Sequence, residues 1–226
     1  MAGEWVVAID GPAGSGKTTT AGEVARRLGF VHLDSGALYR AITLAALDAG
    51  VPPGQPQRVV ALAGQLPIRW VFDGAAFRPE VAGTDVTDAI RAARVTARVS
   101  QYAALPAVRD WVNAELRQAA SGGPAGVVVE GRDIGTVVFP GAALKVFLTA
   151  APEARAVRRL AQEGRAGDAT SVRQQSRELV RRDEADASRD VAPLRAAADA
   201  HTIDTTGLTF EEQVARVVAL ARTAFA

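Results

Sequence analysis

The residues with the clearest chemical pattern lie near the N-terminus, in the stretch Gly11-Pro12-Ala13-Gly14-Ser15-Gly16-Lys17-Thr18-Thr19. A glycine, four variable residues and then Gly-Lys-Thr make up the pattern that cradles the phosphates of a nucleoside triphosphate. The glycines allow backbone N–H groups to turn toward phosphate oxygens. The Lys17 ammonium reaches the β- and γ-phosphates, and the Thr18 hydroxyl is the expected Mg²⁺ ligand. We therefore expect a nucleoside triphosphate to bind at residues 11–19.

The elements on either side of this stretch are those that a phosphate-binding loop needs. The apolar run Trp5–Ile9 predicts a buried strand before it. Ala21, Val24, Ala25 and Leu28 follow it at the spacing of a helix with one buried face. A strand, a glycine loop and a helix in this order favour the phosphate site over a glycine-rich turn with a chance lysine.

Four further apolar stretches predict strands, and two of them end in polar residues. Phe30–Leu33 leads into Asp34, and Val127–Val129 leads into Glu130-Gly131-Arg132-Asp133. The other two are Leu144–Leu148 and Thr202–Asp204. Five strands that alternate with helices predict an α/β fold of three layers, a five-stranded parallel sheet with helices on both faces. Ligands of such sheets bind beyond the carboxyl ends of the strands, where the loop and these polar residues lie.

The remaining elements follow from periodicity and from helix-breaking residues. Helices are predicted at 37–49, 57–65, 88–103, 106–120, 152–164 and 171–187, with a flexible joint at Gly164–Gly167. Thr209 and Glu212 form a capping box before a last helix, whose apolar face is Phe210, Val214, Val217, Val218, Ala221 and Phe225. Residues 68–72 and 77–81 predict a hairpin around Asp73-Gly74, with 84–87 as a short third strand. This predicts a small antiparallel sheet, inserted at about residues 66–88.

The composition bounds the class of protein. The 226 residues have a net charge of +1, which gives no argument for a nucleic-acid partner. The absence of cysteine excludes thiol catalysis and zinc–thiolate sites, and the two histidines, His32 and His201, are expected to be structural. No apolar stretch approaches the roughly 20 residues of a membrane span. We expect a cytoplasmic protein, monomeric and without a membrane or nucleic-acid partner.

A phosphate-binding loop alone does not select the reaction. A switch GTPase needs an Asn-Lys-x-Asp motif, and the two lysines, Lys17 and Lys145, offer none. A motor-type ATPase needs an apolar strand that ends in an acidic residue. The strand that ends at Glu130 resembles this pattern only weakly, because Arg132 follows. A kinase whose acceptor is itself a phosphate needs several cations between two polyanions, and arginine suits that role best. The candidates for this role are Arg40, Arg132, Arg155, Arg158, Arg182 and Arg189.

Four blocks together resemble the bacterial cytidylate kinase family, a family of phosphate-loop nucleoside monophosphate kinases. They are Asp10–Lys17, Leu33–Arg40, Glu130–Pro140 and Arg182–Leu194, and the resemblance covers nearly the whole chain. It implies ATP-dependent phosphorylation of CMP and dCMP to their diphosphates, with Mg²⁺ as cofactor. One departure is Glu130, where the family often has aspartate.

The resemblance also implies roles for individual residues. The acceptor phosphate would be held by Ser35, Arg40, Arg132 and Arg189, the base by Ser100, Arg109 and Asp133, and the sugar by Arg182 and Asp186. Lys17, Arg132, Arg155 and Arg158 would act on the transferring group. Asp34 is expected either in the water shell of Mg²⁺ or in positioning, and the alternative is a simple turn-forming aspartate.

The base assignment makes chemical sense by itself. Cytosine presents an amino donor that the Asp133 carboxylate can accept, and acceptors that suit Arg109 and Ser100. Uracil would present an oxygen to the carboxylate and leave buried polar groups mismatched.

The resemblance divides one kinase domain into three parts. They are a core at about 1–60, 104–160 and 190–226, a monophosphate-binding region at about 35–103, and a lid at about 155–187. Two other functions remain open: a phosphate-loop kinase for another small acceptor, which would not need so many arginines, and a nucleotide switch without transferase activity.

Overall fold

The computed structural model describes residues 5–66, 68–73, 76–121, 126–165 and 167–225. A five-stranded sheet lies at its centre, with strand order β2-β6-β1-β7-β8 and every neighbouring pair parallel. Its strands are β1 (Val6–Asp10), β2 (Val31–Asp34), β6 (Val127–Gly131), β7 (Leu144–Thr149) and β8 (His201–Asp204). The predicted parallel sheet is confirmed, and all five residues of its middle strand β1 are buried.

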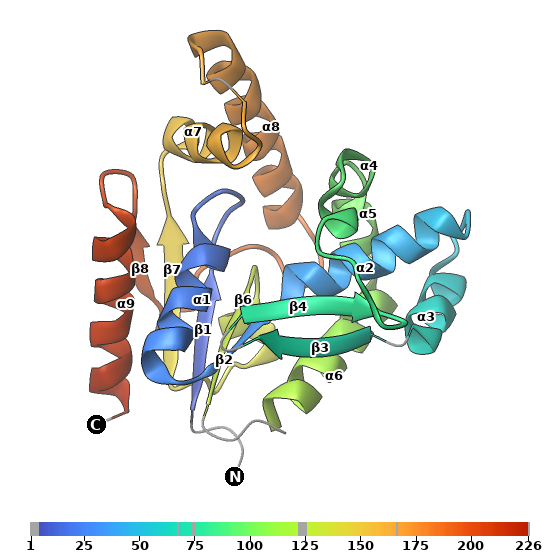
Figure 1. Cartoon of the computed structure of the whole chain (residues 1–226), viewed down its shortest axis with the longest axis horizontal. Helices are drawn as coiled ribbons and strands as arrows, with labels where there is room; N and C mark the ends of the chain where they lie inside the picture. Colours follow the sequence, from blue (N-terminus) through green and yellow to red (C-terminus); the bar gives the residue numbers. More distant parts are fainter. Residues whose placement is uncertain (1–4, 67, 74–75, 122–125, 166, 226) are drawn as a thin grey trace.

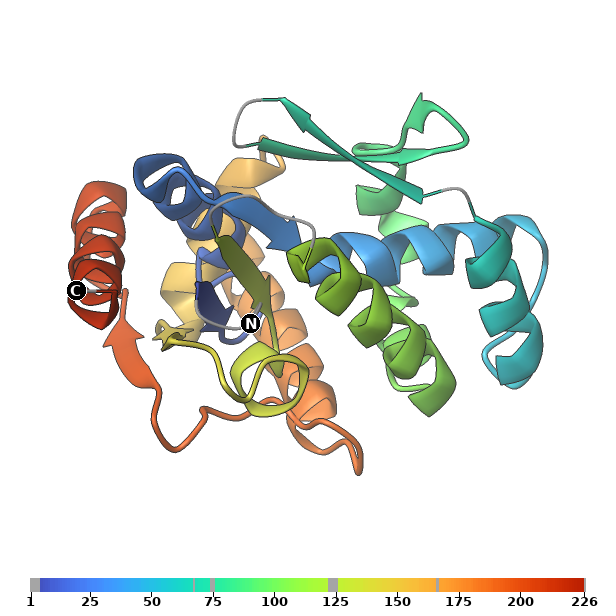
Figure 2. The same ribbon diagram turned by 90° about the horizontal axis from the view of Figure 1, so that it is seen from below.

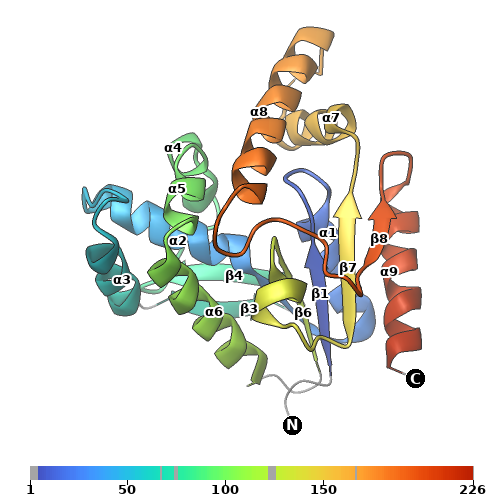
Figure 3. The same ribbon diagram turned by 180° about the vertical axis from the view of Figure 1, so that it is seen from behind.

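Helices cover both faces of this sheet, as Figure 1 and the view from behind in Figure 3 show. On one face, α1 (Lys17–Leu28) and α9 (Phe210–Ala224) pack their apolar stripes against the sheet in one core cluster. On the other face, α2 (Ser35–Asp48), α3 (Pro56–Gln65) and α6 (Pro106–Ser121) form a second cluster. The three predicted layers are therefore present.

The predicted small antiparallel sheet is also confirmed. It has the order β3-β4-β5 and consists of β3 (Ile68–Asp73), β4 (Ala76–Val81) and β5 (Thr84–Asp85). It lies along one side of the domain (Figure 2), where β4 approaches the edge strand β2 of the parallel sheet. Gly74 of the predicted hairpin turn lies outside the described residues.

The helix predicted over residues 88–103 is wrong. The chain forms a 3₁₀ turn (Ala89–Arg91) and two short helices, α4 (Ala93–Thr96) and α5 (Val99–Ala103). The break follows from packing: Ala92 is extended, with ψ of 149°, and this lets Ile90 and Val95 both turn into an apolar cluster with α2. One straight helix could not present both sides of this segment to α2.

Two aromatic residues are more exposed than the sequence indicates. Phe210 is 49% exposed because it is the first residue of α9, at the helix end beyond the buried stripe. Trp5 is 47% exposed and precedes β1 instead of beginning it. Its ring instead packs against Phe225, with the ring centres 5.0 Å apart. The capping box of Thr209 and Glu212 is present as predicted.

A helical hairpin stands above the carboxyl ends of the strands (Figures 1 and 3). It consists of α7 (Pro152–Gln162) and α8 (Ala169–Ala187). The second helix begins two residues earlier than predicted because the Asp168 carboxylate accepts hydrogen bonds from the N–H groups of Thr170 and Ser171. Within the predicted joint Gly164–Gly167, residue 166 lies outside the described residues. None of the helices in the described part of the chain is long and apolar enough to cross a membrane.

Candidate active site

The phosphate-binding loop joins the end of β1 to the start of α1, at the carboxyl edge of the sheet. Gly11 has a φ of 149°, and a Cβ there would collide with the backbone oxygen of Leu148 on the neighbouring strand. Gly16 lies directly before α1 in the left-handed region, with a φ of 89°. The loop therefore lies close against the sheet and directs the N-terminus of α1 toward its concave side, an arrangement suited to an anion.

Lys17 folds back over this loop. Its Nζ donates hydrogen bonds to the Pro12 carbonyl oxygen at 2.6 Å and to Ser15 Oγ at 3.4 Å. Burial, together with the nearby Arg132 guanidinium, lowers the pKa of Lys17 to about 7. A bound anion would stabilise the charged form of this buried ammonium. The phosphates of a nucleoside triphosphate on the loop would be such an anion.

Four arginines from three parts of the chain converge beside the loop. Arg40 comes from α2, Arg132 from the end of β6, and Arg182 and Arg189 from α8 and the segment after it. Burial lowers the pKa of Arg182 to about 9, with the charges of Arg132 and Arg40 acting in the same direction. Burial likewise lowers the pKa of Arg40 to about 10. So much crowded positive charge favours the binding of an anion between the guanidinium groups.

One buried carboxylate holds part of this arginine cluster (Arg40, Arg132, Arg182 and Arg189) together. Asp186 is 2% exposed and accepts a hydrogen bond from Arg132 Nε at 3.0 Å. Its other oxygen accepts from Arg189. The Arg182 Nε is buried without a hydrogen-bond partner among the described residues. The carboxylates of Asp183 and Asp34 also act on Arg182 and Arg40, and together with Asp186 they offset the positive charge of the cluster only in part.

A second buried pair lies next to the cluster. Arg109 Nη2 on α6 donates to Asp133 Oδ2 at 2.5 Å, and both side chains are almost fully buried. The Arg109 guanidinium also lies 5.5 Å from the ring centre of Tyr39. A hydrogen-bond donor (Arg109), an acceptor (Asp133) and an aromatic ring (Tyr39) therefore lie side by side. These groups suit the edge of a nucleobase. Ser100 is half-buried on the neighbouring α5.

Ser35 lies at the junction of α2 and β6. Its hydroxyl donates to the Glu130 carbonyl oxygen at 2.7 Å, which joins the end of β2 to the end of β6. The Glu130 carboxylate points to His32, whose Nε2 lies 3.3 Å from Glu130 Oε1. His32 itself is buried.

The helical hairpin of α7 and α8 contacts the phosphate-binding loop through an apolar cluster of Ala156 and Leu179 with Ala13, and through two charged side chains. Arg155 Nη1 donates to the Ala13 carbonyl oxygen at 3.0 Å and also to Asp183. Asp183 Oδ1 accepts from the Ala13 N–H at 2.9 Å. This contact brings α8 directly onto the loop. Our sequence analysis did not assign Asp183 a role, although it directly follows Arg182 on the same helix.

Arg158 has a different position from the other arginines. Its guanidinium donates to the Thr205 hydroxyl at 2.9 Å and to the Thr205 carbonyl oxygen. Thr205 lies just after β8 and its hydroxyl approaches the Ser15 carbonyl oxygen at 3.5 Å. Arg158 is therefore held at the segment after β8, and the structure does not bring it into the arginine cluster.

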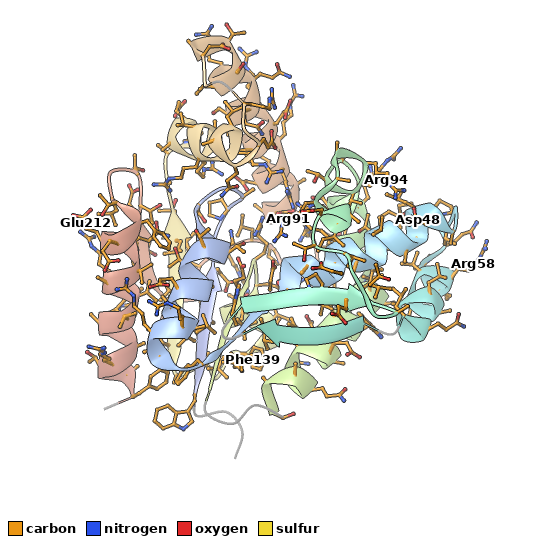
Figure 4. All side chains as sticks on the ribbon, in the orientation of Figure 1. Asp48, Arg58, Arg91, Arg94, Phe139 and Glu212 are labelled. Atoms are coloured by element: carbon orange, nitrogen blue, oxygen red, sulfur yellow. The ribbon has the colours of Figure 1, made fainter. Side chains whose placement is uncertain are left out.

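The two residues expected near Mg²⁺ face one cavity. This cavity of about 270 Å³ is lined by Thr18, Asp34, His32 and Arg91, among others. In Figure 4, Arg91 lies on the side of its segment that faces the phosphate-binding loop, whereas Arg58 lies at the outer edge. Asp34 also accepts a hydrogen bond from the Ala37 N–H at 3.1 Å, so it caps α2.

The donors at this cavity fit Mg²⁺ better than a metal held by a full protein cage. No group of three or more His, Asp or Glu side chains in the described ranges could hold a metal by itself. Mg²⁺ is commonly held by one or two protein oxygens together with phosphate oxygens and waters. The Thr18 hydroxyl, which is hydrogen-bonded to the Glu130 carboxylate, and the Asp34 carboxylate provide such oxygens.

Comparisons with known proteins are consistent along the whole chain. The family described as cytidylate kinase matches residues 7–223. A protein named cytidylate kinase from Streptomyces griseus is 45% identical over 95% of this chain and 91% of its own length. A protein of the same name from Azotobacter vinelandii is 47% identical over 94% and 93%. The solved structure of TT1252 from Thermus thermophilus is similar in fold, with a TM-score of 0.51 and 19% identity over 99% of both chains.

Proposed function

The chain belongs to the cytidylate kinase family, and from this membership we propose that it transfers the γ-phosphoryl group of ATP to CMP and dCMP. The products are CDP and dCDP, which places the reaction in pyrimidine nucleotide metabolism. The chain is an enzyme of the nucleoside monophosphate kinase class. We propose that it acts as a monomer on small molecules in the cytoplasm.

The observation that carries this proposal is the arginine cluster beside Lys17. Two like unit charges about 4 Å apart repel by about 4 kcal/mol at an effective dielectric of about 20. Direct transfer between two nucleotides brings several such charges together, so cations are needed at the junction. Burial and neighbouring arginines hold the pKa of Arg182 near 9, which supports an anion as the missing partner. An alcohol acceptor would not require this cluster.

On the donor side, the phosphates of ATP would lie on residues 11–19. Backbone N–H groups of the loop hold the phosphates, and Lys17 pairs with the β- and γ-phosphates. Arg155 of the lid, residues 155–187, is already hydrogen-bonded to the loop at Ala13 and would need only to turn toward the transferring group. We assign Arg158 to the same lid, although its contact with Thr205 requires a larger movement.

On the acceptor side, the proposal follows the positions of three groups of residues. The CMP phosphate would be held by Ser35, Arg40, Arg132 and Arg189. The cytosine would be read by Ser100, Arg109 and Asp133, and the sugar by Arg182 and Asp186. The Asp133 carboxylate accepts from the cytosine amino group, while Arg109 remains beside it as a donor. CMP would then replace or share the hydrogen bonds that Asp186 and Asp133 now accept from arginines.

Mg²⁺ would be held by the Thr18 hydroxyl and, directly or through water, by Asp34. When bound it would neutralise charge on the β- and γ-phosphates of ATP.

The transfer itself needs no strong general base. The attacking oxygen belongs to a phosphate that is already ionised, so catalysis consists of positioning and charge stabilisation. The Arg132 charge acts on Lys17, which supports a position for Arg132 between the two bound nucleotides, where it would stabilise the charge on the transferring group. Closure of the lid would exclude water, which otherwise competes as the acceptor.

A coupled assay of ADP release tests the proposal. With ATP and Mg²⁺, we expect rapid turnover that depends on CMP or dCMP, and much slower turnover with UMP, AMP or shikimate. ATP hydrolysis at the same rate without CMP would contradict it and favour a nucleotide switch. Turnover with shikimate but not with CMP would favour a kinase for another acceptor.

A further inference from the structure

We propose that Asp10 is a positioning residue, whose carboxylate holds the turn that carries Arg132 and Asp133 in place against the phosphate-binding loop. This inference rests on the proposed function, because its consequence is the recognition of CMP. Asp10 is the last residue of β1 and directly precedes Gly11 of the loop. It is only 4% exposed.

The two oxygens of Asp10 each have a separate partner. Oδ1 accepts from the Ile134 N–H at 2.8 Å, and Oδ2 accepts from the Gly135 N–H at 2.8 Å. These two N–H groups begin the wide helical turn Ile134–Val138, which the sequence did not predict. The carboxylate therefore caps this turn from a strand more than 120 residues away in the chain.

The same turn is held at its other end by the sheet. Gly131 lies opposite Asp10 in the parallel pairing of β1 with β6. Only Arg132 and Asp133 lie between the strand and the residues that Asp10 holds. Their backbone positions are thus set from both sides, and their side chains point to Asp186 and Arg109.

A third contact closes the back of the turn. A Cβ built on Gly135 would lie 3.2 Å from Lys145 Cγ and Cδ and 3.5 Å from Asp10 Oδ2. Lys145 itself is fixed, because its Nζ donates to Asp199 at 2.8 Å. The turn therefore cannot move away from Asp10 toward β7 without displacing this side chain.

Aspartate is chemically required here. Two N–H donors need two acceptors, and a carboxylate has one on each oxygen, whereas asparagine would turn an NH₂ donor toward one of them. Burial raises the pKa of Asp10 to about 6, opposed by its two backbone hydrogen bonds, so keeping the group ionised has a cost in stability. Asp10 lies where the phosphate-binding loop meets the turn that carries Arg132 and Asp133. Its cost in stability there is consistent with a role in aligning the turn with the loop.

The test compares wild type with Asp10→Asn in steady-state kinetics and in direct CMP binding by calorimetry without ATP. We expect KM and Kd for CMP to rise about tenfold or more and the preference for CMP over UMP to fall, while KM for ATP stays within about twofold. Thr209→Ala is the matched control, since it removes a side-chain cap from α9, far from the turn, and should leave all of these constants unchanged.

A second variant reaches the same turn without changing Asp10. Gly135→Ala should raise KM for CMP several-fold, because the added methyl group would press against Lys145 and push the turn away from it. This measurement tests the inference even if Asp10→Asn fails to fold. Unchanged CMP constants in either folded variant, or equal losses for ATP and CMP, would overturn the inference. If the wild type itself does not phosphorylate CMP, the proposed function fails instead.

Discussion

At the scale of single residues, the most unusual feature is like charge held close together. Burial and the Arg132 charge lower the pKa of Lys17, and burial with the charges of Arg132 and Arg40 lowers the pKa of Arg182. The Asp186 carboxylate offsets only part of this positive charge. Such an arrangement is costly to the free protein and favourable once an anion is bound. The excess of positive charge and the buried carboxylates of Asp10 and Asp133 each have a measurable consequence.

Arg132→Ala should lower kcat by a factor on the order of 10² to 10³, because it removes a charge-assisted donor at the transferring group. The measurement is the coupled ADP-release assay at saturating ATP and CMP. Arg26→Ala is the control, since Arg26 forms only an exposed ion pair with Glu23 and should retain wild-type rates. A near-normal kcat in Arg132→Ala would remove this residue from the site.

Asp133→Ala should reduce the ratio of kcat/KM for CMP to that for UMP. The carboxylate favours the amino group of cytosine over the oxygen of uracil, and hydrogen-bonded sites of this kind discriminate strongly. The variant also leaves Arg109 buried without its 2.5 Å partner, so KM for CMP should rise as well. Selectivity equal to that of wild type would refute the base assignment.

Asp10 should make the free energy of unfolding depend on pH in a specific direction. Its pKa is raised from 3.8 to about 6 in the folded chain, so between these values the folded protein binds a proton that the unfolded chain does not. Stability from this group therefore increases as the pH falls from 7 toward 4, by roughly 2 to 3 kcal/mol. Urea unfolding at several pH values should show this gain in wild type relative to Asp10→Asn. A difference between the two proteins that is constant with pH would contradict the expectation.

At the scale of elements, local sequence signals determine some helices, and tertiary packing determines others. The last helix has its capping box, with Thr209 Oγ1 accepting from the Glu212 N–H at 3.2 Å. The segment 88–103 has helical periodicity, yet Ile90 and Val95 bury against α2 and break it into three pieces. A propensity of a few tenths of a kcal/mol per residue does not outweigh the burial of two aliphatic side chains.

Thr209→Ala should lower the free energy of unfolding by about 1 kcal/mol, the usual effect of losing a threonine N-cap. For a domain of this size, the melting temperature should fall by about 2–4 °C. Differential scanning calorimetry measures this shift, and the kinetic constants should not change. A loss of activity at a temperature where the variant is still folded would show that α9 does more than cover the sheet.

At the scale of the whole molecule, the arginine cluster joins α2, β6 and α8, so a bound anion should link the core, the monophosphate-binding region and the lid. A ligand that binds only the folded state stabilises it by about 2.7 kcal/mol at a hundred times its Kd. CMP should therefore raise the melting temperature, and sulfate should do so more weakly.

Arg182→Met separates the stability of the empty site from its function. Removing one buried guanidinium from the cluster should leave the melting temperature of the free protein unchanged or raise it, because burial and the charges of Arg132 and Arg40 disfavour the charge there. The shift that CMP produces should become smaller. A free variant that melts well below wild type, with an unchanged CMP shift, would show that Arg182 supports the fold and not the ligand.

The sequence by itself determined the elements whose signals are local. The five strands, the phosphate-binding loop, the three-stranded insert and the capping box of α9 follow from patterns of apolar residues, glycines and cap residues within short windows. Segment 88–103, and the exposure of Phe210 and Trp5, could not be read this way, since they depend on what each segment packs against.

Only the tertiary structure decided which side chains meet. Asp10 reaches Gly135, Asp183 reaches Ala13, and Arg158 turns to Thr205 instead of the arginine cluster. Each of these contacts joins residues 47 to 170 positions apart in the chain. A side chain's direction depends on the backbone geometry of both partners, and no window of sequence contains both. Residue types and spacing therefore indicate the chemistry, while the fold selects the partners of each charge.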